Sequence, residues 1–274
     1  MEPRLDVASY LVCATPRSGS TLLCGLLASS GAAGHPASYF DPRGMQEHAD
    51  RWGIDRPSHG RIDDVYVRAA LNAGRTPNGV FGGRVMAETL PTLIDDLAAA
   101  SQSSVTDLDL LAAQLGRLRF VHLRRGDVVA QAVSWARSLQ THFWHPGEAI
   151  APGAQDPHYD EQLISELVAR IETLEAGWAR WFAGQGIVPY EVTYEELAAD
   201  PPGTASKVLN WLGLQAQPGC QLATTHQRQA DHVNAEWIHA YKSRRVVAQR
   251  GGVCRAGQGA SRELCRSTAA RLTA

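Results

Sequence analysis

Lysine is nearly absent from this 274-residue chain: among its 26 Lys and Arg residues only Lys207 and Lys242 are lysines. Residues 1–206 therefore cannot carry a lysine-based phosphate loop, a Schiff base or a lysine that anchors a cofactor. The formal net charge of −2 gives no bulk attraction to nucleic acid or to an anionic membrane surface. We expect no nucleic-acid partner, and we expect arginine wherever the chain needs a strong cation.

Paired cysteines and long apolar runs are also missing. The five cysteines are odd in number and form no C-x-x-C, which argues against a disulfide framework or a zinc knuckle and favours a reducing compartment. No apolar run approaches the roughly 20 residues that span a bilayer. Residues 1–7 are charged and contain a proline, unlike an apolar signal segment. We therefore expect a cytoplasmic protein without a membrane span.

Hydrophobic residues make up 44% of the chain and charged residues 20%, a typical globular composition. Short apolar runs alternate with helical patterns, which predicts a P-loop-like α/β fold with a parallel sheet flanked by helices in one domain, residues 1–249. The predicted strands are 9–14, 80–86, 119–123 and 187–192. The predicted helices are 20–30, 61–73, 90–100, 105–115, 127–141, 158–183, 194–199, 205–212 and 234–247. We expect long loops at 32–60 and 142–157, which would shape a pocket, and an irregular or disordered tail at 250–274.

The strongest local motif is TPRSGST at residues 15–21, between an apolar strand and an apolar helix. A helix start leaves backbone N–H groups unpaired and carries partial positive charge, so it favours phosphate or sulfate. Gly19 lets the backbone approach an anion closely, and Arg17 adds a planar donor fork that suits phosphate oxygens. The other donors of the loop are hydroxyls: Ser18, Ser20 and Thr21. The letters match no Walker loop, no dinucleotide-binding fingerprint and no hydrolase nucleophile elbow.

A second basic position follows the third predicted strand. Arg124 and Arg125 stand at its end, and Ser134 lies about two turns into the following helix. Taken alone, such arginines are more typical of a solvated surface. Together with the first loop they lie at the carboxyl ends of parallel strands, where open α/β sheets bind ligands. The two positions together predict a ligand with two separated phosphates.

These stretches resemble the sulfotransferases that use 3′-phosphoadenosine 5′-phosphosulfate (PAPS). The PRSGSTLL stretch at 16–23 resembles their 5′-phosphosulfate loop, and Arg125 with Ser134 resembles their 3′-phosphate site. More narrowly, the chain is similar to the actinobacterial trehalose 2-sulfotransferase type, through RTPNGVFGGRVM at 75–86, DVVAQAVSW at 127–135 and RQAD at 228–231 before Glu236-Trp237. Four segments in the same order, within about residues 9–245, carry the resemblance.

The resemblance implies metal-free, in-line transfer of a sulfuryl group from PAPS to a hydroxyl of a small-molecule or glycan acceptor. Arg17 would stabilise the charge on the departing 5′-phosphate. Arg125 and Ser134 would hold the 3′-phosphate, and Arg228 would close over the nucleotide. Arg84, in the second matching stretch, is a further arginine with a possible role. A homodimer is also implied.

The acceptor side departs from the family pattern. The trehalose enzymes carry a glutamate base in a GEPQEFF-like stretch, whereas residues 34–40 here read GHPASYF, with Ser38 in the place of that glutamate. A hydroxyl nucleophile needs a base within hydrogen-bond reach, and His35 titrates near neutrality. We predict His35 as the general base, and the alternative candidates are Asp41, His48 and Glu88. The missing carboxylate weakens the case for trehalose as acceptor.

Two other classes of function stay open at this point. A nucleotide-binding protein could keep the bisphosphate site and lose the chemistry, which the absent glutamate favours. A kinase-like phosphotransferase would need a degenerate loop, and the missing lysine and the lack of an evident magnesium carboxylate after a strand disfavour it.

Overall fold

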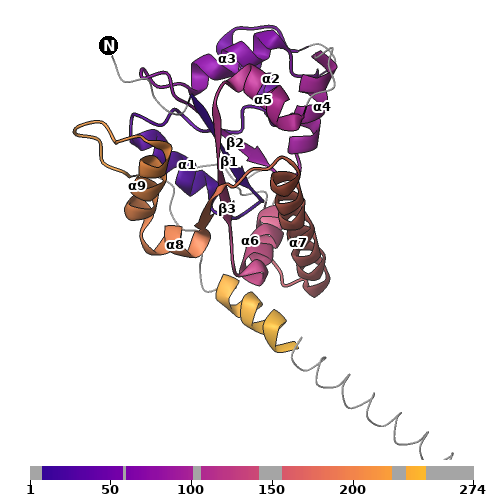
Figure 1. Ribbon diagram of the computed structural model, residues 1–274. Helices are drawn as coiled ribbons and strands as arrows, with labels where there is room; N and C mark the ends of the chain where they lie inside the picture. Colours follow the sequence, from indigo (N-terminus) through magenta and orange to yellow (C-terminus); the bar gives the residue numbers. More distant parts are fainter. Residues whose placement is uncertain (1–7, 58–59, 101–105, 142–155, 224–232, 245–274) are drawn as a thin grey trace, which may run out of the picture.

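Four parallel strands form the sheet at the centre of the protein, in the order β2-β1-β3-β4 (Figure 1). A computed structural model describes residues 8–57, 60–100, 106–141, 156–223 and 233–244. Strand β1 (Ser9–Ala14) lies between β2 (Phe81–Met86) and β3 (Leu118–Arg124), and β4 (Tyr190–Thr193) pairs with the far side of β3. The predicted fold class, a single α/β domain with a parallel sheet flanked by helices, is confirmed.

Helices cover both faces of this sheet. In Figure 1, α1, α8 and α9 lie on one side of the sheet, α6 and α7 lie on the other, and α2 to α5 gather at one end. The helices are α1 (Ser20–Ser29), α2 (Met45–Trp52), α3 (Asp64–Gly74), α4 (Leu90–Ala100), α5 (Asp107–Leu115), α6 (Val128–Thr141), α7 (Glu161–Gly184), α8 (Tyr194–Ala199) and α9 (Pro201–Leu212). A last described helix covers 233–244.

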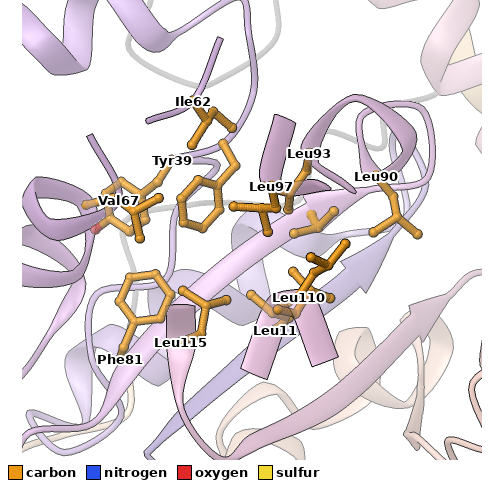
Figure 2. Packing of buried hydrophobic residues seen from close by; sticks show 14 of the residues in the cluster. Leu11, Tyr39, Ile62, Val67, Phe81, Leu90, Leu93, Leu97, Leu110 and Leu115 are labelled. Carbon is orange, nitrogen blue, oxygen red and sulfur yellow. The ribbon is translucent and has the colours of Figure 1, made fainter. Parts of the chain in front are cut away.

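Alternate residues of β1 supply two separate cores. Leu11 and Cys13 belong to the cluster that α3, α4 and α5 complete, part of which Figure 2 shows, while Tyr10 and Val12 face the cluster formed with α1 and α9. Both faces of the strand are therefore buried, as its unbroken apolar run predicts. Full burial of a leucine contributes roughly 1.5–3 kcal/mol, so these two cores fix the position of the strand from which the phosphate loop emerges.

Capping side chains set several helix starts that apolar spacing alone does not locate. Helix α3 begins at Asp64 because the Asp63 side chain accepts from the Tyr66 N–H, and Asp160 caps α7 in the same way. Helix α9 begins at Pro201, four residues before the predicted start, because Asp200 caps it and proline suits a first helical position.

Two expectations about local structure are wrong. Segment 32–60 is not wholly irregular, because α2 lies within it, with Met45 and Ala49 buried and the left-handed Gly53 ending the helix. One turn of apolar spacing was too weak a signal to predict this helix. Strand β4 starts at Tyr190 rather than at residue 187, and Pro189 immediately before it has no N–H for the ladder.

Some predictions concern residues outside the described ranges: Arg228, the tail at 250–274 and most of the loop at 142–157. Within the described ranges, no helix is both long and apolar enough to cross a bilayer.

Candidate active site

The loop after β1 (residues 15–19) leads directly into α1. Gly19 adopts a φ of 94°, and a Cβ there would come within 2.6 Å of Cδ2 of Tyr194, so both conformation and space require glycine. In the described part of the chain no side chain caps the start of α1, so its first-turn N–H groups are available to an anion. The Ser18 hydroxyl is buried and bonds no described residue, a costly state that an oxygen of a bound anion would relieve.

Arg17 has an unusual backbone conformation at the centre of this loop. Its φ of 63° is the only positive value for a non-glycine residue in the described ranges, and this region costs such a residue about 1–2 kcal/mol. Its Nε donates to Oγ of Ser134 in α6 at 3.1 Å. The structure therefore joins directly two predicted residues that the sequence places at different phosphates.

Helix α6 also holds the backbone just before Arg17. Nε2 of the buried Gln131 donates to the Pro16 carbonyl at 2.7 Å and to the Thr15 hydroxyl at 2.9 Å. Ser134 follows Gln131 by three residues, so both lie on one face of the helix. One face of α6 thus fixes the loop and presents Ser134 to it.

Tyr194, the first residue of α8, connects the two predicted anion positions. Its ring packs on Gly19, and the Arg125 guanidinium lies 4.3 Å from the ring centroid, within cation–π range. The Glu195 carboxylate accepts from the N–H groups of Gly126 and Asp127 at 3.1 and 3.2 Å, which fixes the turn after Arg125. Sequence reasoning missed Tyr194, although its place after a strand, at the same edge of the sheet as both loops, was the signal that could have found it.

Arg84 of β2 links the phosphate loop to the acceptor side. Its Nε donates to Ser38 Oγ at 2.8 Å, and its Nη1 donates to Thr21 Oγ1 at 2.9 Å and to Ser20 Oγ at 3.5 Å. Among the described residues this half-buried guanidinium has hydroxyl partners and no carboxylate partner. It is a cation placed between the loop and Ser38.

The four candidates for the general base lie at different positions relative to Arg84 of β2. Ala37 forms a β-bridge with Gly83, so the segment that carries Ser38 runs beside β2. His35 lies before that bridge, is exposed, and donates its N–H to the Gly74 carbonyl at 2.9 Å. The structure thus places His35 near the start of β2, whereas the predicted anion site lies at the other end of the strand.

Asp41 and His48 lie closer to Ser38. Burial alone would raise the pKa of Asp41, but hydrogen bonds from Arg43 and the charges of Arg43 and Arg84 lower it. Burial lowers the pKa of His48, the charge of Arg51 adds to this, and the ring contacts the Ser38 backbone. The His48 imidazole is therefore neutral near pH 7.

The remaining predicted residues form ion pairs. Glu88 pairs with Arg170 of α7, and Arg124 pairs with Glu191 of β4 at 3.4 Å. The structure thus brings Arg17, Ser134, Arg125 and the loop hydroxyls to one end of the sheet and leaves Arg124 with a carboxylate.

Comparison with known proteins identifies the family of this chain. The family described as Stf0 sulphotransferase matches residues 9–244. Trehalose 2-sulfotransferase of Mycobacterium tuberculosis (strain Erdman) is 31% identical over 263 residues, covering 86% of this chain and 95% of that protein. Trehalose 2-sulfotransferase of Mycolicibacterium smegmatis is 31% identical over 273 residues, covering 89% of this chain and 97% of that protein.

A solved sulfotransferase domain of the Synechococcus PCC 7002 olefin synthase aligns with a TM-score of 0.45 at 14% identity, covering 89% of this chain and 90% of that domain. The match over residues 9–244 and the two curated relatives show the family. The chain belongs to the Stf0 sulphotransferase family and is a sulfotransferase.

Proposed function

We propose that this sulfotransferase transfers the sulfuryl group of PAPS to a hydroxyl of a small-molecule or glycan acceptor, without a metal ion. The observation that carries the proposal is the hydrogen bond between Arg17 and Ser134 beside the uncapped start of α1. It joins a phosphate-type loop to the helix that follows Arg125, as binding of one bisphosphorylated nucleotide requires.

The residues of the loop suit the 5′-phosphosulfate end of such a donor. PAPS supplies an activated sulfuryl group with a phosphate as leaving group. The N–H groups of Gly19, Ser20 and Thr21 and the orphaned hydroxyl of Ser18 are donors for its oxygens. Arg17 and the start of α1 stabilise the negative charge that develops on the departing phosphate.

Arg125 and Ser134 are the proposed partners of the 3′-phosphate. Arg125 is held over the Tyr194 ring, and Tyr194 in turn packs on Gly19, so the two ends of the site are coupled by one side chain. Arg228 is proposed, on the resemblance alone, to complete the nucleotide site.

Arg84 is the proposed cation for the group in transfer. It contacts both the loop hydroxyl of Thr21 and Ser38, and it forms no ion pair with a described carboxylate. A sulfuryl oxygen bound between the loop and the acceptor would meet this guanidinium.

For the proton acceptor we propose His48 ahead of His35. His48 is neutral near pH 7, contacts the Ser38 backbone, and has a buried Nδ1 that bonds no described residue. His35 stays the prediction from the sequence, and the two are separated by pH–rate profiles of His35→Ala and His48→Ala. We expect His48→Ala to remove the acidic limb of kcat/KM; a profile changed only by His35→Ala would reverse the assignment.

Calorimetry with adenosine 3′,5′-bisphosphate, AMP and ATP tests the donor. We expect the bisphosphate to bind at least about tenfold more tightly than AMP, since it adds a charge-assisted phosphate contact. Arg125→Ala should remove this preference and leave AMP binding unchanged. Tighter binding of ATP than of the bisphosphate would contradict the proposed donor.

Mass spectrometry of a cell extract incubated with enzyme and PAPS tests the acceptor, with trehalose as the reference substrate. A mass shift of one sulfuryl group is expected on a hydroxyl compound, and turnover should survive a chelator. The proposal extends to a homodimer, which the resemblance implies, and to a cytoplasmic location, which the odd number of cysteines without a C-x-x-C favours. Light scattering and cell fractionation test them.

A further inference from the structure

A polar network connects the phosphate loop to the interior of the sheet. The Thr15 hydroxyl donates to Oε1 of Glu175 in α7 at 2.7 Å. The second oxygen of Glu175 lies 3.2 Å from Nε2 of His122 in β3, and Nδ1 of that imidazole lies 3.0 Å from Oε1 of Glu191 in β4. The contacts therefore run in series from Thr15 of the loop to Glu175, then to His122 and Glu191.

The network is charged although it is largely buried. Thr15 is fully buried, and the His122 side chain is only 7% exposed. Burial alone would lower the pKa of His122, but hydrogen bonds to Glu175 and Glu191 and the charges of these carboxylates raise it to about 9. An imidazolium therefore lies between two carboxylates at neutral pH.

Two charged groups face His122 directly, one from α7 and one from β4. Glu175 faces it from α7 and Glu191 from β4, while Arg124 of its own strand pairs with Glu191. The other contacts are the aromatic rings of Trp178 and Phe182.

Each of the three residues before Arg17 is tied to α6 or α7. The Ala14 carbonyl accepts from Trp178 Nε1 at 3.1 Å, Thr15 is held by Glu175 and Gln131, and the Pro16 carbonyl accepts from Gln131. A residue in a sparsely populated backbone region persists only where its surroundings determine it, and Arg17 is such a residue. The hydrogen bonds of residues 14–16 to α6 and α7 are the contacts that can hold Arg17 in this conformation.

We propose that Glu175 and His122 are positioning residues for sulfuryl transfer: His122 orients the Glu175 carboxylate, Glu175 holds the Thr15 hydroxyl, and Thr15 holds Arg17 in its productive conformation. Neither residue is proposed to touch the donor or the acceptor. The inference rests on the proposed function for the identity of the reaction, but the contacts are independent of it. A shift of about 1 Å in a catalytic group can cost roughly 100-fold in rate, so loss of this hold should reduce kcat.

The test is a double-mutant cycle on the full chain with Thr15→Val, Glu175→Ala and the double variant. We expect each single variant to lower kcat 10- to 100-fold with the acceptor KM within about threefold of the wild type. The double variant should be no slower than the slower single variant, because both changes break one contact. Glu175→Gln keeps an oxygen for Thr15 and should restore kcat to within about threefold of the wild type.

Glu172→Ala is the matched control, because Glu172 is exposed on the same helix, three residues before Glu175. Its kcat should equal that of the wild type. Unchanged kcat in Thr15→Val or Glu175→Ala would overturn the inference, and so would multiplying effects in the double variant or no recovery in Glu175→Gln. Failure of the proposed function shows separately, as a wild-type protein that neither binds the bisphosphate nor turns over PAPS.

Discussion

Replacing Arg17 by glycine and, in a second variant, by alanine separates the backbone strain at this residue from its chemistry. Both variants lose the guanidinium and its hydrogen bond to Ser134. They differ in the backbone, because glycine adopts the left-handed region at φ 63° freely and alanine does not. Comparing the two variants with each other therefore cancels the loss of the side chain beyond Cβ.

The expected difference follows from two opposing contributions. Relief of the left-handed conformation favours the glycine variant by about 1–2 kcal/mol. The greater freedom of glycine in the unfolded chain returns about 0.4–1 kcal/mol. With the midpoints of the two ranges, the free energy of unfolding should be about 0.8 kcal/mol larger for Arg17→Gly than for Arg17→Ala, equivalent to about 2–3 °C in Tm.

Turnover should respond differently from stability. Both variants lack the charged donor at the developing negative charge, so each should lose roughly 100- to 1,000-fold in kcat. Urea denaturation measures the stability, and release of the 3′,5′-bisphosphate from PAPS measures the turnover. Arg68→Ala, at an exposed position of α3, is the control that should change neither. Equal stability of the two Arg17 variants would refute the strain, and turnover by Arg17→Gly at the wild-type rate would refute the catalytic role.

Two further predictions concern Arg84 and His122. Arg84→Met should lower kcat at least about 100-fold, as measured by steady-state kinetics with PAPS. Arg84→Lys should be intermediate, because lysine keeps the charge but not the planar guanidinium that bonds Ser38 and Thr21 together. A fully active Arg84→Met would contradict the proposed contact. Because the pKa of His122 is raised from 6.5 to about 9, its contribution to stability is complete below pH 6.5 and is lost as pH rises to 9. The shift corresponds to at most about 3 kcal/mol, reduced by the half-exposed Glu191. The unfolding free energy of wild type minus that of His122→Gln should therefore shrink between pH 6.5 and 9, and parallel curves would disprove the buried imidazolium.

The sequence was sufficient to predict the strand, loop and helix that form the proposed donor site. An unbroken apolar run, a turn with glycine and three hydroxyls, and an apolar helix are local signals, and each depends on a few adjacent residues. The position of Arg125 and Ser134 at the same edge follows from parallel pairing, since the carboxyl ends of such strands meet there. These are the parts of the site for which chain order and strand direction are enough.

The contacts between distant residues could not be predicted. The place of Tyr194 after a strand indicates its edge of the sheet, but the sequence does not indicate that its ring packs on Gly19. Nor does it indicate that Arg84 bonds Ser38 or that Glu175 reaches Thr15. These contacts depend on which faces of the helices meet the sheet, and many arrangements share the same apolar pattern. The left-handed backbone of Arg17 was equally hidden, because arginine rarely adopts that region and no neighbouring residue type announces it.

The order of the strands has a consequence for how such an enzyme can diverge. The proposed donor loop follows β1, which has a strand on each side and a core on each face, whereas Ser38 is half-buried in a segment beside the edge strand β2. A substitution at Ser38 or at the exposed His35 therefore disturbs fewer packed neighbours than a substitution in β1, which disturbs both cores. Selection can therefore change the acceptor specificity through residues beside the edge strand and leave the loop after β1 unchanged. Libraries that search for new acceptors are best concentrated on His35, Ser38 and Asp41, because Tyr39 and Phe40 between them belong to the core.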